Sequence, residues 1–493
     1  MLAILLVPIV SVTRQWRAEG SWHFLNPVNV FWLAFVYAGV AQPLLSDKEW
    51  IAFYGREVFL STLAMFLVLG IAFAIGYSLT FAQSASRILP DFSKPSQTKV
   101  FVAGVLLIAL GLLGYYLIIR ASGGSKYWLS GPRFNTDYKI LSAYVYTLPR
   151  VATLGLMILL CHAFSQPKAT LYKFAVVGLA IINMLWQAYY GTREGTIMML
   201  VILYGSVFAA LRRNPPIWAT LMLLPAVTFI FGFIPTYRGD FRDLSFNLTD
   251  KPAAIVDRSF GFFSDPDYGS QAPSAYKPDK GPDLWSDFGM AISIAYYVPE
   301  RVHYDGGYML LEILTHGIPR KLWDDKIYPE SMAWDRFHRI TNISTAENFE
   351  GLRGGPSPTM VGKYYYIGGW LGLVVGGMFS GFCFRFLWEF LRRQLRYITG
   401  VILLVASSGL GGMEMIHPLS WSVFFWVPTV FIPFLVFVWI ARDNNAPPEP
   451  LDAELEEREP MPIRVAAAVR RVAPSGAFDK RLPNRRSIRQ RSK

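Results

Sequence analysis

The sequence predicts an all-α, polytopic integral membrane protein with about 10 to 11 transmembrane helices, because about that many stretches reach the roughly 20 apolar residues that span a bilayer. The composition agrees, since 53% of the residues are hydrophobic, 15% are aromatic and only 17% are charged. One long hydrophilic segment interrupts the apolar stretches and forms a large external loop. The expected regions are N-terminal transmembrane helices in 1–236, the loop in 237–364, C-terminal transmembrane helices in 365–441 and a tail in 442–493.

The individual helices are expected where apolar residues run with little interruption. They lie near residues 1–12, 26–45, 56–80, 99–120, 142–165, 171–190, 194–211, 216–236, 365–390, 397–415 and 419–441. The runs at 99–120 and 419–441 are the clearest, because almost no charge falls inside them. The first run, MLAILLVPIVSV, lacks the basic start and the small-residue cleavage site of a signal peptide. It is either a short helix or an interfacial segment.

The positions of basic residues predict how the helices are oriented, because cytoplasmic connections carry an excess of Lys and Arg. The excess falls in the connections with Arg14 and Arg17, with Arg87 and Lys94, with Lys168, with Arg212 and Arg213, with Arg392, Arg393 and Arg396, and in the tail. We therefore expect a cytoplasmic C-terminus and an external large loop. The tail has too few apolar residues to fold alone and is expected to be disordered, with its basic end on anionic lipids. The net charge of +12 is thus assigned to membrane surfaces rather than to nucleic acid.

One external connection, residues 120–141, breaks this rule because it carries four basic residues, including Arg133, against the single Asp137. Either its aromatic and basic side chains reach the lipid headgroups, or it forms a binding site for an anionic substrate.

Two external helix ends carry arginines beside carboxylates. Arg193 and Glu194 stand in the short turn GTRE between two apolar helices, where a guanidinium needs an anionic partner. Glu194 supplies that anion in a purely structural pair; otherwise Arg193 binds a ligand. Arg238, Asp240 and Arg242 follow the next external helix end, and the two arginines share a face if the segment is helical. They either anchor this helix end at the membrane interface or bind a phosphate group.

Two segments of the loop hold further candidates. In HGIPRKLWDDKIYPE, His316 is the best group for proton transfer near neutral pH, Trp323 offers a stacking surface, and Arg320 and Lys326 supply cations.

In GLRGGPSPTMVGKYYYIGGWL, Arg353, Lys363 and Tyr365 lead into an apolar helix. The tyrosines there form an interfacial aromatic belt, or together with the cations they complete a site between the loop and the membrane.

Metal and thiol chemistry are not expected. Cys161 and Cys383 are the only cysteines and both lie in apolar runs, which argues against a disulfide framework, a thiol nucleophile or a Cys-based metal site. No H-E-x-x-H or comparable ligand pattern is present, and no Walker-type loop. We expect no cofactor.

Five segments resemble the bacterial oligosaccharide repeat-unit polymerases, the O-antigen polymerase (Wzy-like) family. They are FLNPVNVFWLAFVYAGVAQPLL, YYGTREGTIMML, YRGDFR, GIPRKLWDDK and GGPSPTMVGKYYYIGGWLGLVVGGMFSG, and their order around a large loop is similar too. The chain has Gly-Thr-Arg-Glu at 191–194 where such polymerases usually have Gly-Ser-Arg-Gly.

The resemblance implies metal-independent glycosyl transfer at the periplasmic face of a bacterial inner membrane. A glycan would leave undecaprenyl pyrophosphate and join an incoming lipid-linked repeat unit, building an O-antigen or exopolysaccharide. Arg193, Arg238, Arg242 and Arg320 are suited to stabilise the leaving group, and His316, Glu194 and Asp240 are the candidate proton acceptors. A flippase and a chain-length regulator are the implied protein partners.

Other functions predict a similar chain. A ligase that moves a finished glycan from the same lipid carrier would have a similar layout and charges. A secondary transporter would more naturally show pseudo-repeated halves and ionisable residues inside its helices, and the polar residues here cluster at helix ends instead. A structural scaffold is a further alternative.

Overall fold

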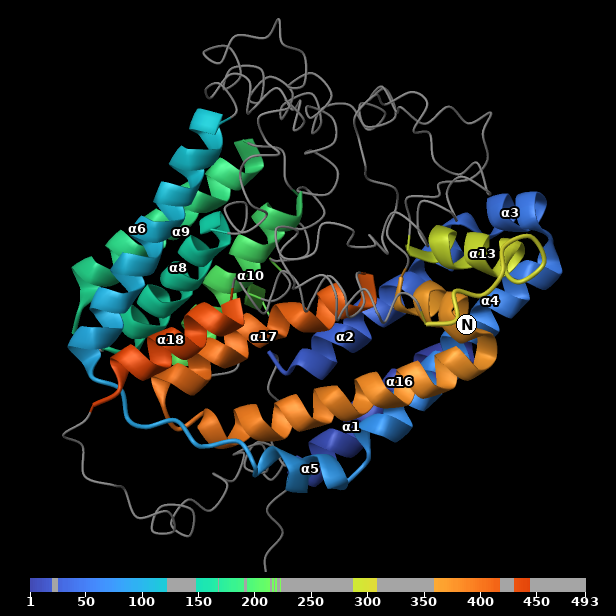
Figure 1. Ribbon diagram of the computed structural model, residues 1–493, viewed down its shortest axis with the longest axis horizontal. Coiled ribbons are helices and arrows are strands. Elements are labelled where there is room, and N and C mark those ends of the chain that lie inside the picture. Colours follow the sequence, from blue (N-terminus) through green and yellow to red (C-terminus); the bar gives the residue numbers. More distant parts are fainter. Residues whose placement is uncertain are drawn as a thin grey trace, which may run out of the picture. The chain divides into compact units, whose positions relative to one another are not determined.

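The computed structural model describes residues 1–19, 25–121, 148–166, 168–189, 193–212, 287–307, 359–416 and 430–443, with a few positions between 215 and 222. Across these ranges the chain is mostly helical and holds no strand (Figure 1). The chain divides into two units, Met1–Asn445 and Ala446–Lys493, and the second unit lies outside the described residues. Most of the helix expected at 216–236, the basic connection 120–141 and the tail also lie outside them.

The helices follow the expected apolar runs closely. They are α1 (Leu2–Glu19), α2 (Pro27–Val36), the π-helical η1 (Tyr37–Ala41), α3 (Gln42–Tyr54), α4 (Arg56–Tyr77), α5 (Phe81–Ser86), α6 (Gln97–Ala121), α8 (Leu148–Ser165), α9 (Thr170–Tyr189), α10 (Arg193–Ala210), α13 (Asp287–Tyr297), α16 (Met360–Gln394), α17 (Ile398–Ile416) and α18 (Ile432–Ala441). Within the described ranges, six helices are long and apolar enough to cross a membrane. They are Pro27–Leu44, Arg56–Tyr77, Gln97–Arg120, Leu148–Ser165, Thr170–Ala188 and Met360–Gln394.

Several elements differ from the expectation. No helix was expected at α5 (Phe81–Ser86), and α3 continues to Tyr54, beyond the helix expected at 26–45. The run at 1–12 is a helix, as one of its two readings predicted, but α1 continues to Glu19. The segment 237–364 was expected to be a loop, yet α13 lies inside it and packs into the hydrophobic core through Phe288, Met290 and Ile294. The helix expected from residue 365 begins earlier, at Met360, and is broken at Gly368 and Gly369. Apolar periodicity alone did not separate the short buried helix α13 from loop.

α4 packs most extensively against α16, and its aromatic side chains also meet those of α2. The rings of Phe31 and Phe73 are stacked at 3.9 Å and those of Phe35 and Phe66 lie 5.8 Å apart, so α2 runs antiparallel to α4. The second half of α16 runs parallel to it, because Gly377 approaches Leu69 while Gly381 approaches the backbone of Phe73. The ring of Phe384 joins this cluster, 5.5 Å from Phe73.

The two halves of α16 form a tight hairpin. We call residues 360–367 the short arm and residues 370–394 the long arm; at about 1.5 Å per residue they are about 12 Å and 37 Å long. Gly369 has φ 60°, a left-handed conformation that favours glycine. The short arm then folds back along the long arm, and the hydroxyls of Tyr364 and Ser380 are hydrogen-bonded at 2.6 Å. The ring of Tyr364 also covers Gly376.

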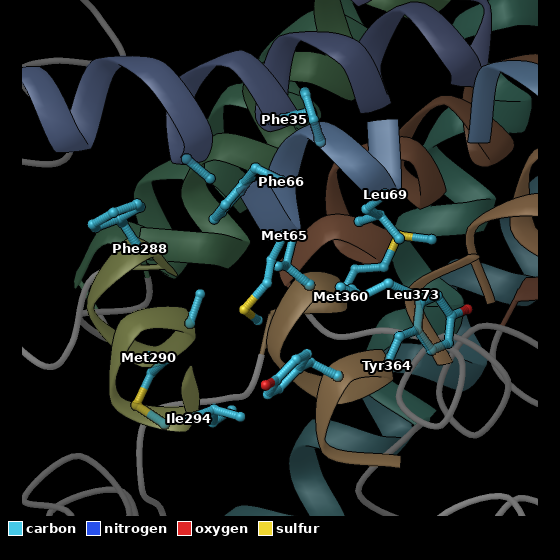
Figure 2. Packing of buried hydrophobic residues seen from close by; sticks show 14 of the residues in the cluster. Phe35, Met65, Phe66, Leu69, Phe288, Met290, Ile294, Met360, Tyr364 and Leu373 are labelled. Atoms are coloured by element: carbon cyan, nitrogen blue, oxygen red, sulfur yellow. The ribbon is translucent and has the colours of Figure 1, made fainter. Parts of the chain in front are cut away.

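α13 is held beside this hairpin by polar contacts with α3. The side-chain oxygen of Gln42 accepts a 2.8 Å hydrogen bond from the backbone N–H of Phe288, and its amide donates to Asp287 at 3.4 Å. Tyr54 and Ser293 are hydrogen-bonded through their hydroxyls at 2.8 Å. On its other side α13 meets the short arm, where Ile294 lies against Gly362. The resulting core between α13, α4 and α16 is shown in Figure 2.

Basic connections meet at the other end of the long arm. Arg393 and Arg396 pair with Asp91 at 3.6 and 3.5 Å. Arg212, after α10, donates a 2.7 Å hydrogen bond to the carbonyl of Arg396. Lys99, at the start of α6, donates to the carbonyl of Arg442 at 2.8 Å. We call the connections 87–96, 392–397 and 441–443, with Arg212, the basic end.

The first prediction tests the hairpin of α16. A side chain at Gly372 would overlap the carbonyl oxygen of Tyr364, so Gly372→Ala should destabilise the folded protein by about 1–3 kcal/mol through overpacking. The measurement is the thermal midpoint of the purified protein in detergent. Gly178→Ala in α9 is the matched control, because nothing lies within 4 Å of the added carbon there and helix propensity favours alanine. Equal midpoints for the two variants would contradict the close approach of the arms.

The second prediction concerns the pH dependence of stability. Burial raises the pKa of Asp287 from 3.8 to about 6, although the hydrogen bond from Gln42 lowers it. Because the folded-state pKa lies above the unfolded value, the free energy of unfolding should fall as the pH rises from about 4 to 6, by at most about 3 kcal/mol, and then level off.

Asp287→Asn should remove this loss of stability, because asparagine does not ionise. The thermal midpoint of the variant minus that of the wild type should therefore be larger at pH 7.5 than at pH 4.5. Glu49→Gln, an exposed acid of α3, is the control for the change in charge. A constant difference between Asp287→Asn and the wild type at all pH values would count against the buried carboxylate.

Candidate functional site

The turn of the α16 hairpin is tied to the segment that follows α13. The backbone N–H groups of Asp305 and Gly306 donate to the carbonyls of Tyr366 and Ile367 at 2.9 and 3.1 Å. These carbonyls belong to the last turn of the short arm, where a helix has no internal donors for them. Asp305 and Gly306, near the end of the segment 298–307, are therefore held against the hairpin turn by backbone hydrogen bonds.

Aromatic rings cover this turn. Tyr304 lies over Gly369, and its ring is 6.1 Å from that of Tyr365 in an edge-to-face arrangement. Tyr365 in turn packs edge-to-face with Trp370 at 5.8 Å. Tyr365 is buried, whereas Tyr304 and Trp370 stay 40% and 42% exposed. We call Tyr304, Tyr365 and Trp370, with Arg301 described next, the tip surface.

Arg301 extends the tip surface with a cation. Its guanidinium carbon lies 5.2 Å from the ring centroid of Tyr296 and 5.5 Å from that of Tyr297, within the range of cation–π attraction. Burial raises the pKa of Tyr297, and the nearby Arg301 lowers it in part. Glu300 and His303 are exposed on the same segment. The surface thus combines aromatic faces with groups of both charges.

Lys363 lies inside the short arm and is only 4% exposed. Thr359 directly precedes this arm as its N-cap, and the Thr359 side chain accepts a hydrogen bond from the N–H of Gly362 at 3.3 Å. The N–H of Lys363 bonds to the carbonyl of Thr359 at 2.8 Å. Lys363 and Tyr365 were both predicted site residues, and the hairpin brings them to the same element beside α13. Neither is on an open loop.

The start of α10 lies at the end of the helices away from the basic end. α10 begins at Arg193 and runs about 27 Å to Ala210, at 1.5 Å per residue. Arg212, just beyond, touches Arg396 after the long arm of α16. Both helices run to the basic end, so the backbones of Arg193 and Glu194 lie at the far end of α10, and the hairpin turn lies at the far end of the long arm. We call the end of α16 that carries the hairpin turn the tip end.

The other predicted site residues lie outside the part of the chain that the structure describes. They are Arg133, Arg238, Asp240, Arg242, His316, Arg320, Trp323, Lys326 and Arg353. The side chains of Arg193 and Glu194 are also outside it, so their roles stay predictions. Within the described residues, no group of three His, Cys, Asp or Glu side chains is placed to hold a metal ion.

Sequence reasoning missed several polar residues of this region. The sequence does not single out Asp287, and its hydrogen bond with Gln42 and raised pKa show that the folded chain largely removes it from water. It does not single out Arg301 or Tyr304 either. The run AYYVPERVHYD, with four aromatic or histidine rings in eleven residues, was the available signal.

Comparison with known proteins gives one match. Residues 132–405, more than half of the chain, match the family model described as a domain of unknown function, DUF8712. No curated protein and no solved structure matches the chain. The matched range contains α8, α9, α10, α13, the α16 hairpin and the first part of α17. The chain therefore belongs to the DUF8712 family of domains of unknown function.

Proposed function

We propose that this protein polymerises oligosaccharide repeat units carried on undecaprenyl pyrophosphate into a surface polysaccharide, at the external face of a bacterial inner membrane. It would act as a metal-independent glycosyltransferase and span the membrane several times, with its large loop outside and its C-terminus in the cytoplasm.

A location in the membrane is supported by the outward faces of the helices. In α9, Leu171 is 84% exposed and Phe174 is 72% exposed, and α6 exposes Leu106 and Leu112 at 60% and 59%. Exposed apolar area of this extent is costly in water and suits a lipid environment. Six apolar helices of sufficient length support the same reading.

The main support for the proposal is that the two ends of the helices carry different kinds of residues. The basic end holds paired arginines and backbone contacts, whereas the tip end holds aromatic rings and a buried lysine. Arg193 starts α10 at the end of that helix away from the basic end. The long arm separates the two ends by about 37 Å, slightly more than the roughly 30 Å hydrocarbon core. A substrate with a lipid anchor and a sugar head needs such a site at a helix end on one face of the bilayer.

In the proposed reaction, one bond to the anomeric carbon of the donor sugar replaces another. A hydroxyl of the acceptor sugar attacks the anomeric carbon of the donor, and the bond from that carbon to the pyrophosphate oxygen breaks. The proton passes from the hydroxyl to a carboxylate or imidazole, for which His316, Glu194 and Asp240 are the candidates. Negative charge gathers on the departing pyrophosphate, where arginines such as Arg193 and Arg238 would stabilise it.

The third prediction tests the orientation. His303→Cys at the tip end should react with a membrane-impermeant maleimide in intact cells, whereas Ser84→Cys near the basic end should react only after the membrane is opened. Both positions are exposed. The unchanged protein is the control for Cys161 and Cys383. Labelling of Ser84→Cys, but not His303→Cys, in intact cells would reverse the orientation and remove the proposed external site.

The fourth prediction tests the arginines. Arg193→Ala and Arg238→Ala should lower polymer longer than one repeat unit by about 100-fold, because a stabilising charge at the leaving group is lost. Arg193→Lys should fall in between, since it keeps the charge but not the two-pronged geometry of a guanidinium. The measurement is the size ladder of surface glycan from a deletion strain that carries each variant at equal membrane abundance.

Arg87→Ala, an exposed arginine at the basic end, is the matched control and should give a normal ladder. Normal long polymer in both Arg193→Ala and Arg238→Ala would remove these residues from the mechanism. Accumulation of long polymer on the lipid carrier in the deletion strain would instead indicate the ligase.

A further inference from the structure

The tip surface has the form of a binding platform. Tyr304 and Trp370 each have one side packed and about two fifths of their surface open. Their positions are set by the backbone bonds of Asp305 and Gly306 to the short arm and by the turn at Gly369. Rings held in this way lose little conformational freedom when a ligand binds, which favours affinity.

Polar groups precede Tyr304 on the segment that links α13 to the hairpin turn. Arg301 is steadied by the rings of Tyr296 and Tyr297, and Glu300 and His303 are exposed beside it. A pyranose presents a flat face of C–H groups that packs on an aromatic ring, and its rim of hydroxyls needs both donors and acceptors. A few convergent polar groups around an apolar surface supply that combination.

An apolar strip starts directly at this platform. Leu371, Val375 and Phe379 recur every fourth residue on the long arm, so they share one helix face, and they are 71%, 58% and 52% exposed. The strip runs from Trp370 toward the basic end. A hydrocarbon chain lying on it would bring the head group that it carries to the tip surface from within the bilayer.

We propose that the tip surface is a saccharide-binding subsite, on which the sugars next to the lipid carrier stack against Trp370 and Tyr304 while the carrier lies along Leu371, Val375 and Phe379. This inference rests on the proposed function for the lipid-linked form of the ligand. It adds residues that the arginine-based site does not include. His303, next to Tyr304 in the chain, and Arg301, three residues before Tyr304, are the polar groups that this segment offers to the hydroxyls of the sugars.

Membrane anchoring alone explains the surface less well. An anchoring Trp or Tyr needs only one apolar side and one polar tip. Here Tyr304 and Trp370 both pack on the buried Tyr365, and the segment that carries Tyr304 is bonded to the hairpin backbone. That degree of fixed order suits recognition of a particular ligand.

The test measures saccharide binding without the reaction. Full-length protein in lipid nanodiscs is titrated with oligosaccharides of one to three repeat units, released by mild acid from the host's own glycan and therefore free of lipid and pyrophosphate. Trp370→Ala should weaken binding about five- to tenfold, and Tyr304→Ala by a similar factor, from the loss of one stacked ring each. Trp370→Phe should keep most of the affinity.

Two controls keep the result interpretable. Trp439→Ala removes a 77% exposed tryptophan of α18 near the basic end and should bind as the wild type does. A lowered thermal midpoint identifies a variant that fails to fold. If Tyr304→Ala fails to fold, the comparison of Trp370→Ala with Trp370→Phe is sufficient to test the inference. Unchanged affinity in Trp370→Ala, or no binding by the wild type, would overturn the inference and leave an interfacial anchor.

The failure of this inference can be told apart from the failure of the proposed function. Arg193→Ala should lose polymer but keep oligosaccharide binding, because the probe has no pyrophosphate. If the wild type binds the probe through Trp370 while deletion cells still make long glycan, the subsite stands and the polymerase proposal falls. If polymer requires the protein while Trp370→Ala binds normally, the polymerase proposal stands and the subsite falls.

Discussion

The packing of the short arm of α16 against its long arm is the interaction on which the rest of the tip end depends. It requires a left-handed residue at Gly369 and a backbone approach at Gly372 that leaves no room for a side chain. The hydrogen bond between Tyr364 and Ser380 then fixes the length over which the arms overlap. Without this fold-back, Lys363 would not be buried and the carbonyls of Tyr366 and Ile367 would not face residues 305 and 306.

α13 depends on the same hairpin and also on a chain segment far from it in sequence. Gln42, just after a π-helical turn, supplies both an acceptor and a donor to the first residues of α13. The cost is the burial of Asp287, whose pKa rises to about 6. A carboxylate destabilised in this way tends to persist where a fixed position matters more than stability, and here it lies at the base of the helix that leads to the tip surface.

The two helix ends differ in their physical character. At the basic end the arginines are paired with Asp91 or bonded to backbone carbonyls, and several connections that are remote in sequence meet there. Such partly exposed ion pairs add little stability individually, but together they bring the ends of α6, α10, α16 and α18 into contact. At the tip end the contacts are aromatic and backbone-mediated, which leaves polar groups facing outward for a ligand.

The sequence by itself determined the apolar runs, and with them the existence and limits of most helices to within a few residues. Length and hydrophobicity are local properties, so α4, α6, α9 and α10 were predicted from the chain alone. The grouping of Arg87, Arg212 and Arg396 at one end was also predictable, because charge excludes these connections from the apolar layer.

The tertiary structure alone decided which polar residues became part of a site. Lys363 and Tyr365 were predicted to stand at a helix entrance, but their burial follows from a break at two glycines inside an otherwise continuous apolar run. Asp287 and Tyr304 gain their roles from partners in α3 and α16 that lie between 60 and 245 residues away along the chain. Propensity and periodicity act over a few residues, whereas these contacts form only when distant helices pack, which is why the sequence predicted the helices and the packing created the surface.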